Sequence, residues 1–210
     1  MNFHLSKWLR IGRILFAGLA IAALSAQLRQ SIEAGRSTVD FFSYFTIQSN
    51  MMAVIVLLWV AMKSGDRNKQ LLRDIVRGAP VLYLGVTGIV FAVLLSGLPL
   101  VTVPFANTVL HKIMPVVLIV DWLLDPPHPG LSFRKALVWM VYPIAWLVYA
   151  MARGTITGWY PYPFLNPAKM GGYIHVLEVM LVILAGGVLL IGVIVRIGHF
   201  SRRYFHPGES

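Results

Sequence analysis

The sequence contains no cysteine and only 8 acidic residues among its 210 positions. Without cysteine, disulfide bonds and thiolate metal ligands are excluded. Three catalytic signatures are also missing: the G-x-S-x-G nucleophile elbow, the H-E-x-x-H zinc motif and the phosphate-binding P-loop. The segment GTITG at 154–158 looks like the elbow, but Ile156 stands where the nucleophile is needed. These absences argue against several common classes of soluble hydrolase and against P-loop enzymes.

Apolar residues dominate the chain. They make up 58% of the sequence against 12% charged residues, and the mean hydropathy is +0.73. This composition indicates an integral membrane protein, because a bilayer-spanning helix takes about 20 apolar residues. Backbone groups cannot stay unpaired in lipid, so each long apolar stretch is expected to be helical. Six such stretches predict an all-α, polytopic bundle that forms a single domain over 1–210, with helices near 11–30, 41–63, 76–98, 105–124, 135–152 and 173–196.

The basic residues predict the orientation of this bundle. Thirteen of the 18 Lys and Arg residues lie at the N-terminus, in 63–77, at 134–135 or in 196–203, and only four lie in the alternate connections. Cytoplasmic loops carry such an excess, so both termini are expected to be cytoplasmic. The net charge of +10 is thereby explained by topology and anionic lipid, and no nucleic acid partner is expected. The segment DRNKQLLRDIVR at 66–77 is interpreted as the main solvated cytoplasmic loop.

Polar residues interrupt the second apolar stretch, FFSYFTIQSNMMAVIVLLW at 41–59. Thr46, Ser49 and Asn50 follow an i, i+3, i+4 spacing and therefore share one helix face, whereas Gln48 points elsewhere. With the predicted orientation, Thr46 lies about one and a half turns below the outer surface. Hydrogen-bonding groups at this depth are candidates for function because their burial in hydrocarbon is costly.

The fourth stretch carries a histidine to a similar depth. In ANTVLHKIMP, Asn107 lies one turn above His111 and Pro115 one turn below it. Proline lacks a backbone N–H and crowds the carbonyl four residues earlier, so a kinked, locally open turn is expected. Lys112 is expected to snorkel toward the surface or to meet a substrate carboxylate.

The sixth stretch and the connection before it carry further polar residues to about the depth of Thr46 and His111. GGYIHVLEVM places His175 and Glu178 one turn apart near the outer surface. The connection over 153–172 is rich in aromatic residues and proline, which predicts a packed cap or lid over the bundle. Within it, Tyr160 and Tyr162 are interpreted first as an interfacial aromatic belt and second as support for a site.

A threonine and a histidine at matching depth suggest nucleophilic catalysis. The hydroxyl of Thr46 needs a base, and neutral His111 is a suitable one near pH 7. Ser49, Asn50 and Asn107 are candidate donors to an oxyanion. Glu178 or Asp121 is a candidate to orient His111, although Asp121 and Trp122, near the cytoplasmic end, are interpreted as structural. The set suits acyl transfer from a lipid ester, without a cofactor.

Two alternatives stay open at this point. His111, His175 and Glu178 form a plausible two-histidine, one-carboxylate set for zinc or iron, which would make the protein a metal-dependent hydrolase. Alternatively, the same polar cluster binds a lipid or another ligand without chemistry, or belongs to a small transporter. No internal repeat is evident, which weakens the transporter alternative.

Three segments resemble a known family. FTIQSN at 45–50, the N-x-x-x-H-x-x-x-P pattern at 107–115 and YPYPFL at 160–165 are similar to the androgen-induced-gene family, which includes the androgen-dependent tissue-factor-pathway regulator and a bacterial six-helix branch. The resemblance implies a multipass membrane hydrolase of fatty acid esters of hydroxy fatty acids, with Thr46 as nucleophile and His111 as its histidine. It also implies a lipid substrate and a prokaryotic plasma membrane.

Overall fold

The computed structural model describes residues 3–62, 70–97 and 103–205, and no strand occurs in these ranges. Six helical segments are long and apolar enough to cross a membrane, which confirms the predicted fold class and fits a multi-pass integral membrane protein. The segments are α1 (Phe3–Glu33); α3 (Phe45–Met62); α4 (Gln70–Val90) with a π-helical turn, Phe91–Leu95; α5 (Pro104–Thr108), a π-helical turn, Val109–Ile113, and α6 (Met114–Leu124); α7 (Phe133–Ala136), a 3₁₀ turn, Leu137–Met140, and α8 (Val141–Thr157); and α10 (Tyr173–Phe205).

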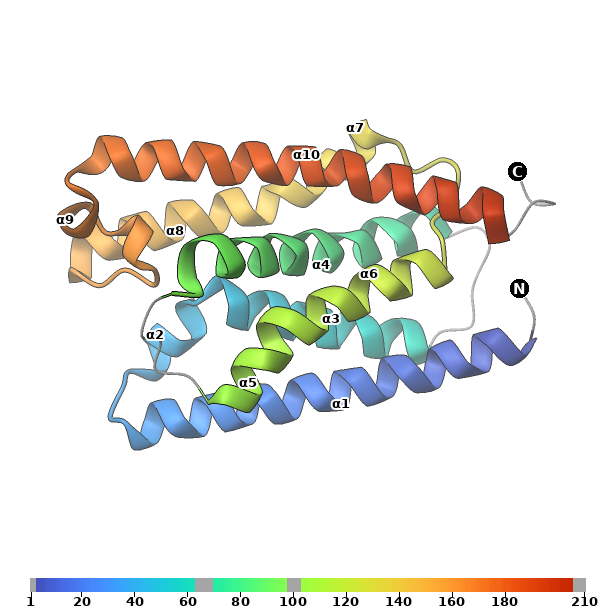
Figure 1. Ribbon diagram of the computed structural model, residues 1–210, viewed down its shortest axis with the longest axis horizontal. Coiled ribbons are helices and arrows are strands. Elements are labelled where there is room, and N and C mark those ends of the chain that lie inside the picture. The colour runs from blue at the N-terminus through green and yellow to red at the C-terminus, as the bar shows by residue number, and fades with distance from the viewer. Residues whose placement is uncertain (1–2, 63–69, 98–102, 206–210) are drawn as a thin grey trace.

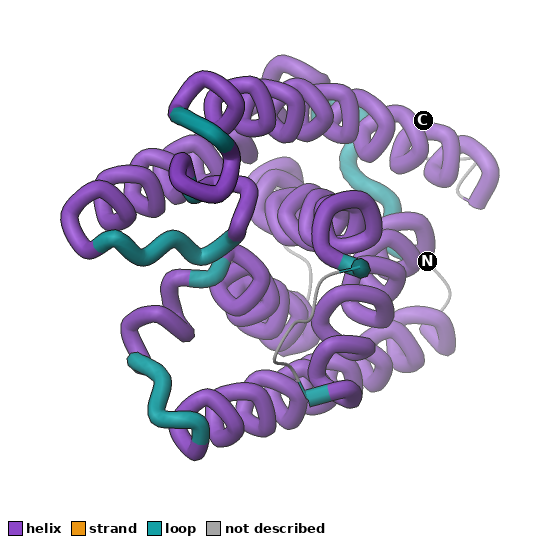
Figure 2. Tube along the Cα trace, turned by 60° about the vertical axis from the view of Figure 1, so that its left-hand side comes forward, coloured by secondary structure: helices purple, strands orange, loops and turns teal. Residues whose placement is uncertain are grey.

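These segments run along one long axis (Figure 1). Helix α3 packs against α1 and α4, and α4 also packs against α6 and α10. The first turn of α1 and the last turn of α10 lie at the same end, whereas the short helices α2 (Thr38–Ser43) and α9 (Pro167–Met170) lie at the other. The described loops between the helices are short (Figure 2), and the packing of α10 on α4 brings segments that are distant in the sequence side by side.

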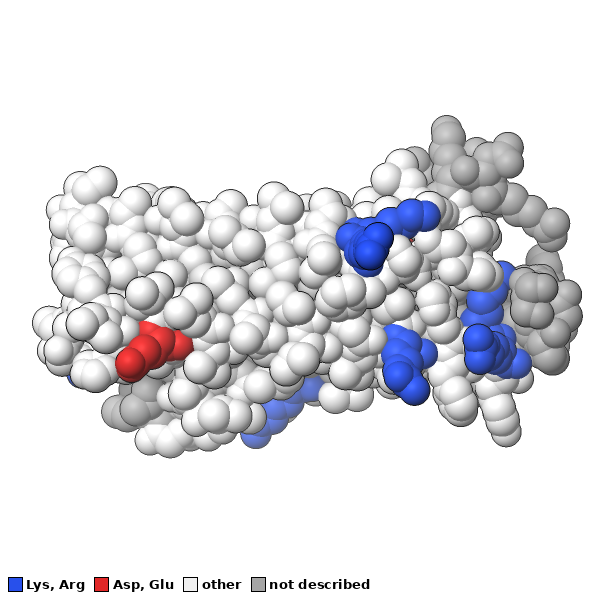
Figure 3. All heavy atoms as spheres, turned by 90° about the horizontal axis from the view of Figure 1, so that it is seen from above, with Lys and Arg blue, Asp and Glu red and all other residues white. Residues whose placement is uncertain are grey.

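Charge is distributed unevenly along this axis. On the face in Figure 3, Lys and Arg gather mostly toward the end where α1 begins and α10 ends, and acidic residues appear near the opposite end. This distribution agrees with the count made from the sequence. The assignment of the basic end to the cytoplasm stays a prediction.

The second predicted helix is interrupted inside the bundle. Tyr44 is extended, with φ −68° and ψ 131°, and separates α2 from α3. The indole N–H of Trp146 donates to the carbonyl of Ser43 at 3.0 Å, and the Tyr44 ring packs edge-on against Trp159 and Tyr162. Contacts from distant segments therefore stabilise a break that local apolarity does not predict. Its consequence is that α3 begins at Phe45, directly before Thr46.

The irregular turn expected before Pro115 is present. Residues Val109–Ile113 form a π-helical turn, in which the N–H of Met114 donates to the carbonyl of Val109. Proline removes one helical donor, and such turns are frequent at functional sites. Helix α4 approaches this turn closely at Gly88, where a Cβ would lie 3.4 Å from the carbonyl oxygen of His111.

The structure corrects the interpretation of the loop at 66–77. Residues 63–69 lie outside the described residues, but Arg73, Asp74 and Arg77 belong to α4. Asp74 and Arg77 are buried, and Arg77 pairs with Asp74 and with Asp121 of α6 at 3.2 and 3.1 Å. These residues therefore form part of an ion-pair network between helices, because charges inside a bundle are retained where they are paired.

Trp122 is completely buried and its indole N–H donates to the carbonyl of Ile194 at 3.0 Å, which agrees with its structural interpretation. The segment predicted as a lid begins later than residue 153, because α8 continues to Thr157. The loop proper covers 158–172, with a 3₁₀ turn, Pro163–Leu165, and α9 within it.

Candidate functional site

Thr46 and His111 lie next to each other toward the end of the bundle that carries α2, and the sequence suggested that they share a level. The Nε2 atom of His111 is 3.4 Å from the hydroxyl oxygen of Thr46. Thr46 stands in the first turn of α3, directly after the break at Tyr44, and His111 stands within the π-helical turn. Two irregular backbone features, and not two regular helices, bring the hydroxyl and the imidazole together.

The surroundings of the ring define its tautomer. The Nδ1 atom of His111 lies 3.2 Å from the backbone carbonyl of Asn107. A carbonyl only accepts, so Nδ1 carries the proton and Nε2 of the neutral ring presents its lone pair to Thr46. The ring also stacks on Phe91, with centroids 4.3 Å apart. A backbone carbonyl thus orients the histidine, in the place where the sequence suggested Glu178 or Asp121.

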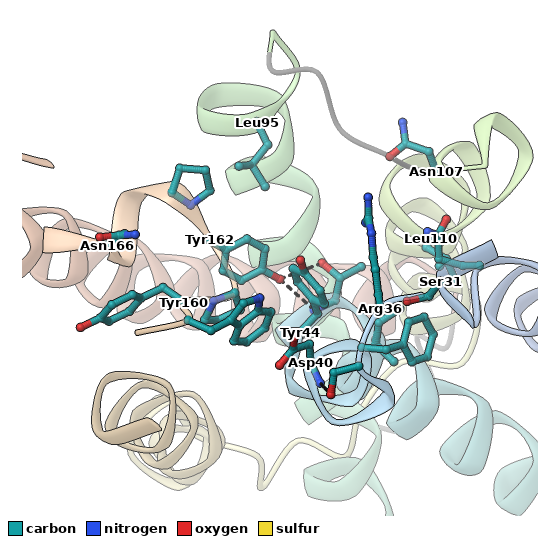
Figure 4. A pocket seen from close by; sticks show the side chains of 18 of the residues that line it. Ser31, Arg36, Asp40, Tyr44, Leu95, Asn107, Leu110, Tyr160, Tyr162 and Asn166 are labelled. Carbon is teal, nitrogen blue, oxygen red and sulfur yellow. Dashed lines mark hydrogen bonds between the residues drawn. The ribbon is translucent and has the colours of Figure 1, made fainter. Parts of the chain in front are cut away.

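Tyr162 supplies a third group at this point. The N–H of Thr46 donates to the phenol oxygen at 3.2 Å, and the two hydroxyl oxygens are also 3.2 Å apart (Figure 4). Burial raises the pKa of Tyr162 to about 12, although its hydrogen bonds with Thr46 act in the opposite direction. The phenol therefore keeps its proton and remains a donor at neutral pH. The belt interpretation does not hold for this residue, whose hydroxyl points into the bundle.

Ser49 and Asn50 share the face of Thr46, as predicted, but their donors are engaged elsewhere. The Ser49 hydroxyl donates to the carbonyl of Thr46 at 3.2 Å. The Asn50 amide donates to that same carbonyl at 2.8 Å and to the carbonyl of Leu110 at 3.3 Å. Asn50 therefore ties α3 to the π-helical turn and supports the geometry of the site from behind. Gln48 points away, toward Phe42 and Tyr142.

A cavity of about 590 Å³ opens onto the pair. Thr46, His111 and Asn107 all line it. Toward the end that carries α2 and α9, polar side chains from several segments surround the cavity: Gln27, Ser31, Arg36, Asp40, Asn166 and Lys169. The side chain of Arg36 extends along it in Figure 4. The hydroxyl and imidazole are thus accessible from a cavity with both polar and apolar walls, because Phe41, Ile47 and Leu95 line it as well. It is called the polar cavity below for the charged and amide side chains in its wall.

The remaining predicted residues lie apart from this pair. Nδ1 of His175 and the Glu178 carboxylate pair with each other at 3.1 Å, on the exposed surface of α10. Lys112 is exposed. Tyr160 lines the cavity, and its ring packs so closely on Gly154 that a Cβ there would lie 2.1 Å from it. Asp121 pairs with Arg13 and Arg77 near the opposite end, which agrees with its structural interpretation.

The metal alternative finds no support in the part of the chain that the structure describes. Among these residues there is no group of three or more His, Asp or Glu side chains that could hold a metal ion. His111, His175 and Glu178 are not gathered around one point, because the first faces Thr46 and the other two pair on the surface. The chemistry available at the cavity is that of a hydroxyl, a neutral imidazole and a protonated phenol.

Comparisons of the chain with protein-family models, curated proteins and solved structures gave no match.

Proposed function

We propose that this protein is an intramembrane hydrolase of fatty-acyl esters, with Thr46 as nucleophile and His111 as general base. One observation carries the proposal: the unprotonated Nε2 of His111 faces the Thr46 hydroxyl in the wall of an accessible cavity. A hydroxyl is a weak nucleophile until a neighbouring base accepts its proton. The resemblance to the androgen-induced-gene family supports the same roles and favours a prokaryotic plasma membrane as the location.

The reaction follows from these positions. Nε2 of His111 takes the proton of the Thr46 hydroxyl, and the Thr46 oxygen bonds to the ester carbonyl carbon at the same time. The Tyr162 phenol, which keeps its proton, donates to the developing negative charge. The imidazolium then protonates the alcohol oxygen as the carbon–oxygen bond breaks and the alcohol leaves. In the second half, Nε2 of His111 takes a proton from water as the water oxygen bonds to the acyl carbon. The bond between this carbon and the Thr46 oxygen then breaks, the fatty acid leaves, and His111 returns the proton to the Thr46 oxygen.

An acylating probe tests this proposal. A fluorophosphonate that labels activated hydroxyls should label the wild-type protein and Thr46→Ser, but not Thr46→Ala or His111→Ala. Thr155→Ala is the matched control, because this threonine is exposed near the end of α8. In detergent, the wild-type protein and Thr46→Ser should also release fatty acid from a long-chain ester, whereas Thr46→Ala and His111→Ala should not. Unlabelled wild-type protein that releases no fatty acid would instead favour a lipid-binding protein or a transporter, and full activity of Thr46→Ala would overturn the assignment of the nucleophile.

A further inference from the structure

A second, apolar cavity meets the polar cavity at Thr46. Thr46, Tyr162 and Leu95 line both spaces, so they form the boundary between them. The apolar cavity has a volume of about 60 Å³ and lies between α3, α4, α8 and α10, with Trp146 and Phe164 in its wall. A scissile ester at Thr46 would therefore have a polar space on one side and an apolar space on the other.

The apolar cavity continues toward the surface of the bundle. A cleft of about 360 Å³ lies between α4 and α10, and it shares Val86, Val90, Ile183 and Gly187 with the inner cavity. Its other lining side chains are apolar apart from Glu178 at its outer rim. Helices α4 and α10 both belong to segments long enough to cross the membrane, so this cleft opens sideways toward lipid. The two spaces therefore adjoin each other at the four residues that they share, and Thr46 lines the inner one.

We propose that the acyl chain of the substrate occupies this apolar cleft and inner cavity, while the alcohol part occupies the polar cavity. The inference rests on the proposed hydrolase function. A hydrocarbon chain fits a cleft without hydrogen-bond partners, whereas a polar alcohol fits the cavity lined by Ser31, Asn107 and Arg36. With the substrate placed in this way, a lipid ester can enter from the side while its acyl chain stays in the hydrocarbon core of the membrane.

Glycine at 186 keeps the cleft open. Gly186 lines it, and a Cβ built there meets no atom within 4 Å. At the neighbouring Gly187, a Cβ would lie 3.3 Å from the sulfur of Met140, so a larger residue there would strain the packing. A leucine at 186 thus fills space that the acyl chain would use without first clashing with the protein. Gly18 of α1 offers a matched control, because it is exposed, helical and also free of neighbours within 4 Å.

The first test is the acyl-chain selectivity of purified protein. Gly186→Leu should lower the ratio of kcat/KM for a hexadecanoyl ester to that for a butanoyl ester by roughly tenfold or more, since the loss of burial of about two methylene groups of the long chain changes its binding by this factor. Gly18→Leu should leave the ratio unchanged. An unchanged ratio in Gly186→Leu, with a wild-type enzyme that hydrolyses both esters, overturns the placement of the chain.

The second test does not depend on turnover. A hexadecanoyl ester with a mid-chain diazirine is photo-crosslinked to Thr46→Ala protein, with and without excess unreactive ester, and the crosslinks are mapped by mass spectrometry. Competable crosslinks on α4 and α10 that weaken in Gly186→Leu support the proposal even if no hydrolysis is found. Competable crosslinks on α1 and α2 would place the chain in the polar cavity and overturn it, as would the absence of competable crosslinks.

Discussion

The Nε2 atom of His111 lies 3.4 Å from the hydroxyl oxygen of Thr46, although 65 residues separate them in the chain. The contact depends on the backbone on both sides. Tyr44 interrupts one helix so that Thr46 lies in the first turn of α3, and the π-helical turn before Pro115 holds His111. The Asn50 amide bridges the two by donating to the carbonyls of Thr46 and Leu110. The Asn50 amide thus ties together the two backbone segments that position the pair, which is the support that the proposed catalytic groups would require.

Removing the phenol hydroxyl of Tyr162 should impair catalysis and leave the fold intact. In Tyr162→Phe the ring can still stack on Phe164, with which it makes a 5.1 Å centroid contact, but the donor next to Thr46 is lost. Loss of one donor to a developing oxyanion lowers kcat by roughly 100- to 1000-fold. The measurement is steady-state hydrolysis of a long-chain ester, with thermal unfolding in detergent as the control for folding.

The pH dependence of kcat distinguishes a proton-donating role of Tyr162 from a purely structural one. Because burial raises the pKa of Tyr162 to about 12, the wild-type enzyme should lose no activity to phenol ionisation up to about pH 10. A fall in kcat with an apparent pKa near 10 that disappears in Tyr162→Phe would contradict this environment. An enzyme that keeps full kcat in Tyr162→Phe would remove the tyrosine from the mechanism.

The sequence was sufficient for the approximate place of the six spans and for the prediction that Thr46 and His111 lie at one level. Apolar length alone identifies the six segments, and helical spacing puts Thr46, Ser49 and Asn50 on one face. The break at Tyr44 could not be predicted, because it depends on Trp146 and Tyr162 from later segments. The burial of Asp74 and Arg77 could not be predicted for the same reason. A run of charged residues is usually interpreted as a solvated loop, and the partner of Arg77 on another helix cannot be identified from the sequence.

Gly154→Ala should displace the loop that carries Tyr162. An added Cβ would lie 2.1 Å from the ring of Tyr160, two residues before Tyr162. Overpacking of this kind typically costs about 1–3 kcal/mol. We expect a lower unfolding temperature together with reduced ester hydrolysis. The second substitution Tyr160→Ala should relieve the clash and restore part of the activity, and Gly12→Ala, with no atom within 4 Å of its Cβ, should behave like the wild type.

Asp125 should stabilise the bundle at neutral pH and lose this effect in acid. Burial of the carboxyl favours its neutral form, but ion pairs with Arg77, Arg73 and Arg13 outweigh burial and hold the pKa of Asp125 well below its usual range. A depressed folded-state pKa contributes stability that is fully present above the unfolded value of about 3.9, and this contribution declines progressively as pH falls from there toward the folded-state pKa.

Asp125→Asn should therefore lower the free energy of unfolding by about 3 kcal/mol at pH 7, the scale expected for a broken buried ion pair. The difference from wild type should narrow below about pH 4. Thermal unfolding of the wild type and the variant in detergent, at pH 7 and again below about pH 4, measures this difference in stability. The control is Glu33→Gln, which removes an exposed pair with Arg29 and should change little at either pH. A difference that stays constant with pH would contradict an ionised Asp125.

The orientation can be tested on a chain with no native cysteine, because every thiol introduced is the only one present. Thr155 and Arg134 are exposed near opposite ends of one span, Phe133–Thr157. The basic bias predicts that Thr155→Cys reacts with a membrane-impermeant maleimide in intact cells, whereas Arg134→Cys reacts only after permeabilisation. The reverse pattern would invert the topology, and labelling of both in intact cells would contradict a span. Because the polar cavity opens toward the end of the bundle that carries Thr155, the predicted pattern would also mean that Thr46 and His111 meet water, and release the alcohol, from the outer side.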